Sequence, residues 1–271
     1  MRNPFEEEPL IQVFFGGDPK VGKTTLVSHL RDGESFNADH IFSATIGSDF
    51  APLRDYILRS HNVRLQVSLV DSAGDTKFNS VQPIYLRRAE AVFLVFSLTD
   101  QASFDCLLPR WKQLHEEYEK RYRQNMDEPI TAGDFAPDRI VILIGNKLDE
   151  VEKNPDKRKV TTEQGQNLAV ALGAKHYYER SALYDTDMGH LRMPLDIALR
   201  YVVEKRQKQA ASWSRDLVNQ NKGKPTNPLI QLAWHDNTED KASLNKREEV
   251  YGIHSLGAQQ QQQQQKACCH S

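Results

Sequence analysis

The sequence predicts an α/β fold in which helices cover both faces of a mostly parallel sheet. Segments with the pattern of strands alternate with helical segments through residue 205. Three of the strands, at residues 11–15, 91–98 and 139–144, are apolar on both faces. Such strands are typical of parallel sheets, because helices bury both sides. In this architecture ligands bind beyond the carboxyl ends of the strands.

Each predicted strand has its own pattern. Residues 11–15 (IQVFF) form an apolar run that ends at two glycines, and residues 91–98 and 139–144 are continuous apolar runs of strand length. Residues 49–58 and 63–70 indicate a strand pair joined by a polar turn, and residues 175–178 indicate a short strand.

Helices are predicted between these strands, over residues 21–31, 76–88, 102–123, 162–172 and 193–206. The longest carries Trp111, Leu114 and Tyr118 on one side, the spacing of an amphipathic helix. Cys106 is expected within it as a small buried hydrophobe. Gly173 ends the fourth helix as a C-cap glycine does. Two prolines in residues 125–138 predict a loop.

Composition divides the chain into three parts. Apolar residues make up 39% of the 271 residues, below the roughly 45–50% typical of a compact domain. A polar segment at residues 206–271, with seven consecutive glutamines, accounts for the deficit and predicts a flexible tail. We therefore expect a flexible N-terminus over residues 1–8, one domain over residues 9–205, and the tail. A net charge of −2 argues against binding nucleic acid through bulk positive charge.

The strongest motif follows the first predicted strand. The segment GDPKVGKT fits the G-x-x-x-x-G-K-[ST] pattern of a phosphate-binding loop. Its glycines let backbone N–H groups point at phosphate oxygens, and the following helix adds the positive end of its dipole. Lys23 is expected to reach the β- and γ-phosphates, and the Thr24 hydroxyl to bind Mg²⁺. The candidate nucleotide-binding residues here are Gly17, Asp18, Pro19, Lys20, Val21, Gly22, Lys23, Thr24 and Thr25.

A second motif indicates which base is bound. Asn146, Lys147 and Asp149 (NKLD) follow the strand at residues 139–144. The Asp149 carboxylate can accept hydrogen bonds from two nitrogens of guanine, whereas adenine would leave that carboxylate unpaired. Ser181, Ala182 and Leu183 follow the last short strand, where the N–H of Ala182 is expected to meet the guanine O6.

Two further segments complete the expected phosphate site. Asp71 and Gly74 (DSAG) follow the strand at residues 63–70. Asp71 is expected to hold Mg²⁺ through water, and the N–H of Gly74 to meet the γ-phosphate. Thr45 (ATIG) lies in the loop before residue 49, and its hydroxyl is expected to close over Mg²⁺ and the γ-phosphate. The metal candidates are therefore Thr24, Thr45 and Asp71, and the expected ligands are GTP or GDP with Mg²⁺.

The ordered set GDPKVGKT, TIG, DSAGD, NKLD and SAL, within residues 9–205, resembles a Ras-superfamily small GTPase. The resemblance implies a three-layer P-loop NTPase fold and a six-stranded sheet with five parallel strands. It also implies a monomer with two switch segments, here residues 36–50 and 71–88, that bind effector proteins, an exchange factor and a GTPase-activating protein. Phe36 is the candidate for the aromatic residue that packs on the guanine.

Two branches of the superfamily share features with this chain. TIGSDF, DSAGDTKFNSVQPIYLRRA and the terminal pair Cys268 and Cys269 resemble the Rab branch. VFLVFSL followed by ASF and Trp111, and residues 160–183, resemble Rho segments, but the Rho insert after NKLD is absent. We therefore expect a Rab-like GTP/GDP switch in vesicle trafficking or signalling, and a Rho-like signalling GTPase is the alternative.

The double cysteine predicts attachment to a membrane. Prenylation of Cys268 and Cys269 by a prenyltransferase would anchor the chain peripherally on the cytoplasmic face, because two lipids give stable anchoring. The first residues lack a signal-peptide pattern, and the longest apolar run has eight residues, against about 20 for a bilayer span. A cytoplasmic protein without its own transmembrane segment is therefore expected.

Asp75 departs from the family, which has a glutamine there to orient the attacking water. Aspartate is shorter, has no donor when ionised, and brings negative charge toward the γ-phosphate. Pro19 donates no N–H and its ring narrows the same space. We therefore expect slow hydrolysis, with Lys23, Thr45, Gly74 and Asp75 as the catalytic candidates. The alternative is a GTP-binding interaction module with little or no hydrolysis.

Overall fold

The computed structural model describes residues 10–37, 48–74, 82–122, 139–183 and 188–220. Pro9–Leu199 form one compact unit, and Met1–Glu8 with Arg200–Ser271 form another. The elements follow in the order β1 (Ile11–Gly16), α1 (Lys23–Asp32), η1 (Gly33–Ser35), β2 (Ser48–Leu58), β3 (Val63–Ser72), α2 (Gln82–Arg88), β4 (Ala89–Ser97), α3 (Gln101–Asp105), α4 (Leu107–Tyr122), β5 (Ile140–Asn146), α5 (Leu148–Lys153), η4 (Pro155–Lys157), α6 (Thr162–Leu172), β6 (His176–Glu179) and α7 (Met188–Gln220).

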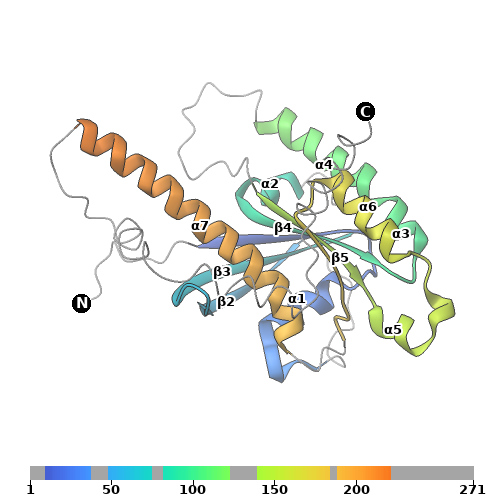
Figure 1. The fold of residues 1–271 in the computed structure, drawn as a ribbon. Helices are drawn as coiled ribbons and strands as arrows, with labels where there is room; N and C mark the ends of the chain where they lie inside the picture. The colour runs from blue at the N-terminus through green and yellow to red at the C-terminus, as the bar shows by residue number, and fades with distance from the viewer. Residues whose placement is uncertain (1–9, 38–47, 75–81, 123–138, 184–187, 221–271) are drawn as a thin grey trace, which may run out of the picture. The chain divides into compact units, whose positions relative to one another are not determined.

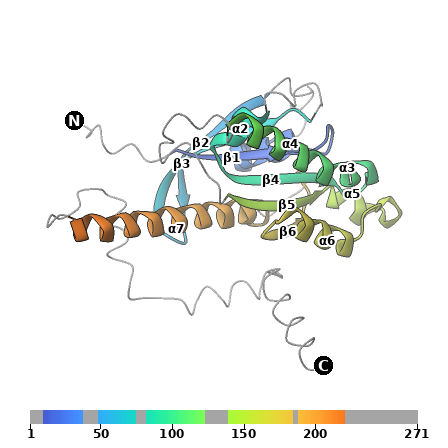
Figure 2. The same ribbon diagram turned by 90° about the horizontal axis from the view of Figure 1, so that it is seen from above.

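The six strands form one sheet in the order β2-β3-β1-β4-β5-β6. β2 pairs antiparallel with β3, whereas each of the other neighbouring pairs is parallel. Figure 2 shows β1, β4, β5 and β6 running side by side. The predicted six-stranded, mostly parallel sheet is therefore confirmed.

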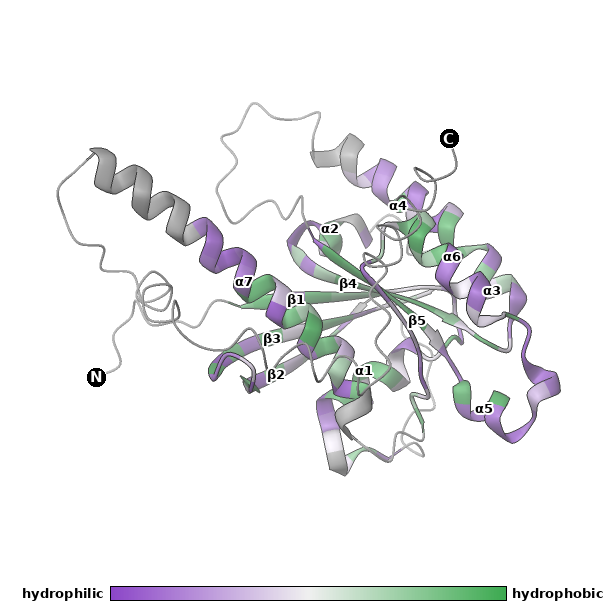
Figure 3. Cartoon of the chain, in the orientation of Figure 1, coloured by the Kyte–Doolittle hydropathy of each residue, from purple (hydrophilic) through white to green (hydrophobic). Residues whose placement is uncertain are grey.

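The core lies on both faces of the central strands. Phe14 and Phe15 of β1, which point to opposite faces, are fully buried, as are Phe93 and Phe96 of β4. The helices mix hydrophobic and hydrophilic residues, whereas the central strands are hydrophobic (Figure 3). Figure 1 shows α2, α4 and α6 on one side of the sheet and α1 on the other. Two-sided burial explains why these strands are continuous apolar runs.

Strand register gathers the motifs at one edge. Phe15 of β1 is level with Asp71 of β3, and Gly16 is level with Leu94 of β4. Ser97, the last residue of β4, is level with Asn146, the last residue of β5. The segments that follow β1, β3 and β5 therefore leave the sheet at the same edge, where ligands bind in this architecture.

The predicted helix over residues 102–123 is broken at Cys106. Asp100 caps α3 by accepting a hydrogen bond from the N–H of Ala102, and α4 then begins at Leu107. Pro109 lies in the first turn of α4, where its missing N–H costs no intrahelical hydrogen bond. The prediction that Cys106 is buried is wrong: its side chain is exposed, because it lies at the break and not on the apolar face.

Other boundaries differ from the predictions. α5 was missed, because six residues are too few to show a helical period. α7 begins five residues before the predicted start at 193 and contains Pro194. It extends past 206 to Gln220, close to the continuation to about Val218 that the sequence allowed. Of the predicted helix at residues 76–88, the described part contains α2. Within the described residues, no helix combines the length and apolarity that crossing a bilayer requires.

Candidate functional site

The phosphate-loop candidates lie in the turn between β1 and α1. Gly17 (φ 145°) and Gly22 (φ 94°) adopt conformations that L side chains rarely adopt. A Cβ at Gly17 would collide with the carbonyl oxygen of Val95, so the loop lies directly on β4. Pro19 and Lys20 are exposed at the tip of the turn, and Lys20 also has a positive φ of 65°. The backbone thus curls as the sequence motif predicts.

Lys23 is buried at the first residue of α1. Its ammonium group donates hydrogen bonds to the carbonyls of Gly17 (2.9 Å) and Asp18 (2.8 Å). Burial lowers the pKa of Lys23 to about 8, while the carboxylates of Asp71 and Asp18 raise it. An anion beside Nζ would favour the charged form. Thr25 follows within the first turn of α1.

The expected metal ligands on α1 and β3 lie together. The Thr24 hydroxyl donates a 2.6 Å hydrogen bond to Oδ2 of Asp71, whose side chain is buried. Two oxygen donors in this position fit Mg²⁺, which prefers oxygen ligands and keeps several waters or phosphate oxygens. Within the described residues, no group of three or more His, Cys, Asp or Glu side chains could hold a metal ion. The case for Mg²⁺ here is the pair of oxygen atoms from Thr24 and Asp71 beside the phosphate loop.

Asn146 links the phosphate loop to the base-side loops. Its side-chain nitrogen donates to the carbonyl of Val21 (2.8 Å), and its side-chain oxygen accepts from the N–H of Ala182 (3.0 Å). The N–H of Ala182 that was expected to meet the guanine O6 is therefore donated to Asn146 in this structure. Asn146 is buried at the end of β5, and its contacts join the loop after β1 to the loop after β6. A Cβ at Gly22 would collide with this amide, so glycine is also required there by the close approach.

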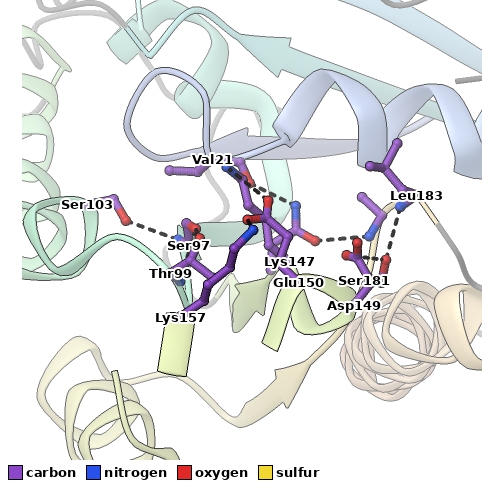
Figure 4. Close-up of polar contacts among 12 residues, drawn as sticks. Val21, Ser97, Thr99, Ser103, Lys147, Asp149, Glu150, Lys157, Ser181 and Leu183 are labelled. Carbon is purple, nitrogen blue, oxygen red and sulfur yellow. Dashed lines mark hydrogen bonds and ion pairs between the residues drawn. The ribbon is translucent and has the colours of Figure 1, made fainter. Parts of the chain in front are cut away.

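Asp149 is held by the loop that follows β6. The hydroxyl of Ser181 donates to Oδ1 of Asp149 (2.8 Å) and accepts from the N–H of Leu183 (3.3 Å) (Figure 4). Asp149 lies in the first turn of α5, and Lys147 at the N-cap of α5 has a left-handed backbone with φ 67°. The Asp149 side chain is 9% exposed, and its Oδ2 lies 3.9 Å from Nζ of Lys153.

Phe36 packs against α1 through a ring contact with His29 that the sequence did not indicate. Its ring stacks on His29, with centroids 4.2 Å apart and planes 4° apart. Nδ1 of His29 donates to the carbonyl of Ala182 (2.8 Å). His29 therefore links Phe36 to the loop after β6, which is predicted to meet the base.

Gly74 lies against the phosphate loop, and Arg110 contacts both. A Cβ at Gly74 would lie 2.7 Å from the carbonyl oxygen of Asp18 and would collide with the nitrogen of Pro19. Nη1 of Arg110 donates to the carbonyl of Gly74 (2.7 Å) and pairs with Oδ1 of Asp18 (2.8 Å). The sequence did not indicate Arg110 as a site residue, apart from its position next to Trp111.

Four of the candidate residues lie outside the described residues: Thr45, Asp75, Cys268 and Cys269. The structure brings the other candidates into two neighbouring groups. The phosphate-side group contains the loop between β1 and α1 with Asp71 and Gly74, and the base-side group contains the segments that follow β5 and β6.

Comparison with known proteins identifies a family. The Ras family model matches residues 12–193. Ras-related protein Rab-15 of Homo sapiens is 32% identical over 174 residues, which cover 64% of this chain and 68% of that protein. Ras-related protein Rab-12 of Homo sapiens is 29% identical, covering 69% and 70%, and Ras-related protein Rab-37 of Homo sapiens is 28% identical, covering 78% and 82%.

These relatives agree with the motifs that predicted the Rab branch. The match covers the sheet, the phosphate loop and both base-side loops. The chain belongs to the Ras family and is a small GTPase of Rab type.

Proposed function

We propose that this GTPase is a Mg²⁺-dependent switch that binds GTP and GDP at the loops following β1, β3, β5 and β6. The observation that carries the proposal is the bridge formed by Asn146 between Val21 and Ala182. It ties a loop suited to phosphates to a loop suited to a base, at a spacing set by the sheet. A nucleotide could then contact the phosphate loop through its phosphates and the loop after β6 through its base.

The proposal gives each candidate group a role. Lys23 and the backbone N–H groups of the loop bind the β- and γ-phosphates. Thr24, Asp71 and Thr45 would hold Mg²⁺, which neutralises phosphate charge when bound. Asp149 accepts from the guanine edge, with Ser181 holding its second oxygen in place. The reaction is in-line attack of water on the γ-phosphate, stabilised by Lys23 and the N–H of Gly74.

Binding of fluorescent GDP and ADP, with and without Mg²⁺, tests this assignment. Asp149→Asn is expected to weaken GDP binding by about 100-fold or more, since an unpaired donor then faces guanine (about 2.7 kcal/mol). Asp156→Asn is the matched control, because Asp156 is an exposed carboxylate on η4. Equal binding of ADP and GDP by the wild type would contradict the proposal.

We propose slow hydrolysis because of Asp75. Single-turnover hydrolysis by Asp75→Gln is expected to be at least about 10-fold faster than by the wild type, since glutamine restores a donor and removes a charge. Hydrolysis below detection in both proteins, with GTP bound, would favour the alternative of a GTP-binding interaction module. Equal and readily measured rates would contradict the role given to Asp75.

We also propose an effector surface on the two switch segments. Phe50 on β2 and Ile84 on α2 are 50% and 49% exposed, although both are large hydrophobic residues. The Phe50 ring contacts the edge of Tyr85 with centroids 5.4 Å apart, which joins the two segments into one apolar surface. Exposed apolar side chains of this kind suit a protein partner. Loss of nucleotide-dependent partner binding in Phe50→Ser would support it, and unchanged binding would contradict it.

Membrane attachment is proposed to act through the tail. Residues 9–205 would form the nucleotide-binding domain, and residues 206–271 would act as a tether with prenyl groups on Cys268 and Cys269. Such an anchor suits a role in vesicle trafficking at a cytoplasmic membrane face. Metabolic labelling with a prenyl precursor should label the wild type but not the Cys268→Ser, Cys269→Ser double variant. Labelling of both, or of neither, would contradict the anchor.

A further inference from the structure

Arg110 connects three parts of the molecule through one nitrogen. It lies in the first turn of α4, next to the buried Trp111. Its Nη1 donates a 2.7 Å hydrogen bond to the carbonyl of Gly74 and lies 2.8 Å from Oδ1 of Asp18. Nη1 makes its hydrogen bond to Gly74, whereas its contact with Asp18 is an ion pair, since Oδ1 of Asp18 accepts no hydrogen bond from the described residues. α4, the phosphate loop and the residue after β3 are thereby held together.

The contact acts on backbone that is already tightly packed. Gly74 is buried, and its Cα lies so close to the loop that a Cβ would meet Asp18 and Pro19 backbone atoms. Arg110 uses the carbonyl oxygen of Gly74, so the N–H of Gly74 remains a donor for a phosphate oxygen. The side chain therefore fixes the position of this donor without occupying it.

The ion pair between Arg110 and Asp18 also places a positive charge beside a carboxylate in the phosphate loop. Asp18 places a carboxylate, 16% exposed, inside a loop that must receive a polyanion. Burial raises the pKa of Asp18 above its usual value, and the charges of Arg110 and Lys23 offset this only in part. An ionised Asp18 without a counter-charge would repel the phosphates. Arg110 supplies that charge from outside the loop, which leaves the Lys23 ammonium for the phosphates.

We propose that Arg110 is a positioning residue for the γ-phosphate, which holds Gly74 on the phosphate loop and neutralises Asp18. The inference rests on the proposed nucleotide site. Because only GTP has the phosphate expected to reach Gly74, Arg110 contributes more to GTP binding than to GDP binding. It is thus a determinant of how strongly this switch discriminates its two states.

Dissociation rates of fluorescent GDP and of a non-hydrolysable fluorescent GTP analogue, both with Mg²⁺, test the inference. Arg110→Met keeps an unbranched apolar stem but removes the donors and the charge. It is expected to release the GTP analogue about 10-fold faster, equivalent to about 1.4 kcal/mol, with the GDP rate changed less than about two-fold. Lys112→Met, at an exposed position on α4, is the matched control and should change neither rate.

Two further variants separate positioning from mere stability. Arg110→Lys keeps the positive charge and a hydrogen-bond donor, so its dissociation rate for the GTP analogue should return most of the way to that of the wild type. Adding Asp18→Asn to Arg110→Met removes the uncompensated carboxylate, so the double variant should hold the analogue more tightly than Arg110→Met alone. Without that recovery, the charge role given to Arg110 is wrong.

The outcome that overturns the inference is an equal factor for GDP and the analogue in Arg110→Met. That result would mean that Arg110 only supports α4, and the melting temperature would fall in parallel. Failure of the wild type to bind either nucleotide would instead contradict the proposed function. The two failures are therefore distinguishable in one set of measurements.

Discussion

Replacement of Gly22 by alanine should damage both stability and nucleotide binding, because two separate features exclude a side chain there. The backbone has φ 94° and ψ 24°, a left-handed conformation. A Cβ would also collide with the side-chain nitrogen of Asn146. Asn146 would have to move, and its hydrogen bonds to Val21 (2.8 Å) and Ala182 (3.0 Å) would be lost or weakened.

The magnitude follows from these two parts. A non-glycine residue in the left-handed region costs about 1–2 kcal/mol. Each buried hydrogen-bonding group left unsatisfied costs about 1–3 kcal/mol. Loss of both hydrogen bonds in Gly22→Ala is therefore expected to lower the free energy of unfolding by about 3–8 kcal/mol. Gly173→Ala is the matched control, because Gly173 has φ 69° and no atom within 4 Å of its Cβ position; it should cost only the backbone strain of about 1–2 kcal/mol.

Urea unfolding of the two variants and the wild type measures this difference directly. GDP affinity provides the second readout, since the bridge of Asn146 joins the phosphate and base sides of the site. Gly22→Ala should weaken GDP binding by about 100-fold or more, whereas Gly173→Ala should leave it unchanged. The reasoning is refuted if the two variants lose equal stability, because the collision with Asn146 would then have no energetic consequence.

Three other predictions each concern a single side chain. Glu179→Gln should lower the free energy of unfolding by about 1–3 kcal/mol at pH 7, because Glu179 accepts hydrogen bonds from Arg158 (2.6 and 3.1 Å) and Tyr177 (3.0 Å). Burial alone would raise the pKa of Glu179, but these hydrogen bonds lower it below its usual value. The stabilisation is therefore present above about pH 4.3 and lost as the pH falls through the folded-state pKa. Between pH 7 and pH 3, the free energies of unfolding of the wild type and Glu179→Gln should therefore converge. A constant difference between the two proteins would contradict this. Tyr56→Phe removes the 2.8 Å hydrogen bond to the partly buried Asp196, so it should lower stability by about 1–2 kcal/mol in urea unfolding, and no change would mean that water replaces the hydroxyl. Cys106 is exposed, so in a Cys268→Ser, Cys269→Ser background it should react with a thiol reagent as fast in the folded as in the unfolded protein, and protection from the reagent would contradict the exposed break between α3 and α4.

Local motifs explain why much of the fold and site was predictable. The turn from Gly17 to Thr24 depends on residues that are consecutive in the chain. The segments 91–98 and 139–144 are continuously apolar, and this composition by itself predicts buried strands. The break at Cys106 was not predictable from periodicity, because it depends on a cap by Asp100 and on Pro109 one turn later. α5 is too short to produce a period.

Contacts between distant segments were not predictable. His29 reaches Ala182 across 153 positions of sequence, and Arg110 reaches Gly74 across 36. Neither residue type marks a site by itself, since histidine and arginine on amphipathic helices usually face solvent or fill a core. Their roles depend on helix rotation and on the register between β1, β3 and β4, which no short window of sequence contains.

Residue order alone was enough to predict the α/β class, the phosphate loop and the guanine motif, because backbone conformation and binding chemistry there depend on neighbours along the chain. Tertiary structure was needed to show that Asn146 bridges Val21 and Ala182, that Phe36 stacks on His29, and that Arg110 joins Asp18 to Gly74. Each of these contacts requires two elements to be packed at a specific distance and rotation, and that geometry arises only when the whole sheet and its helices are assembled.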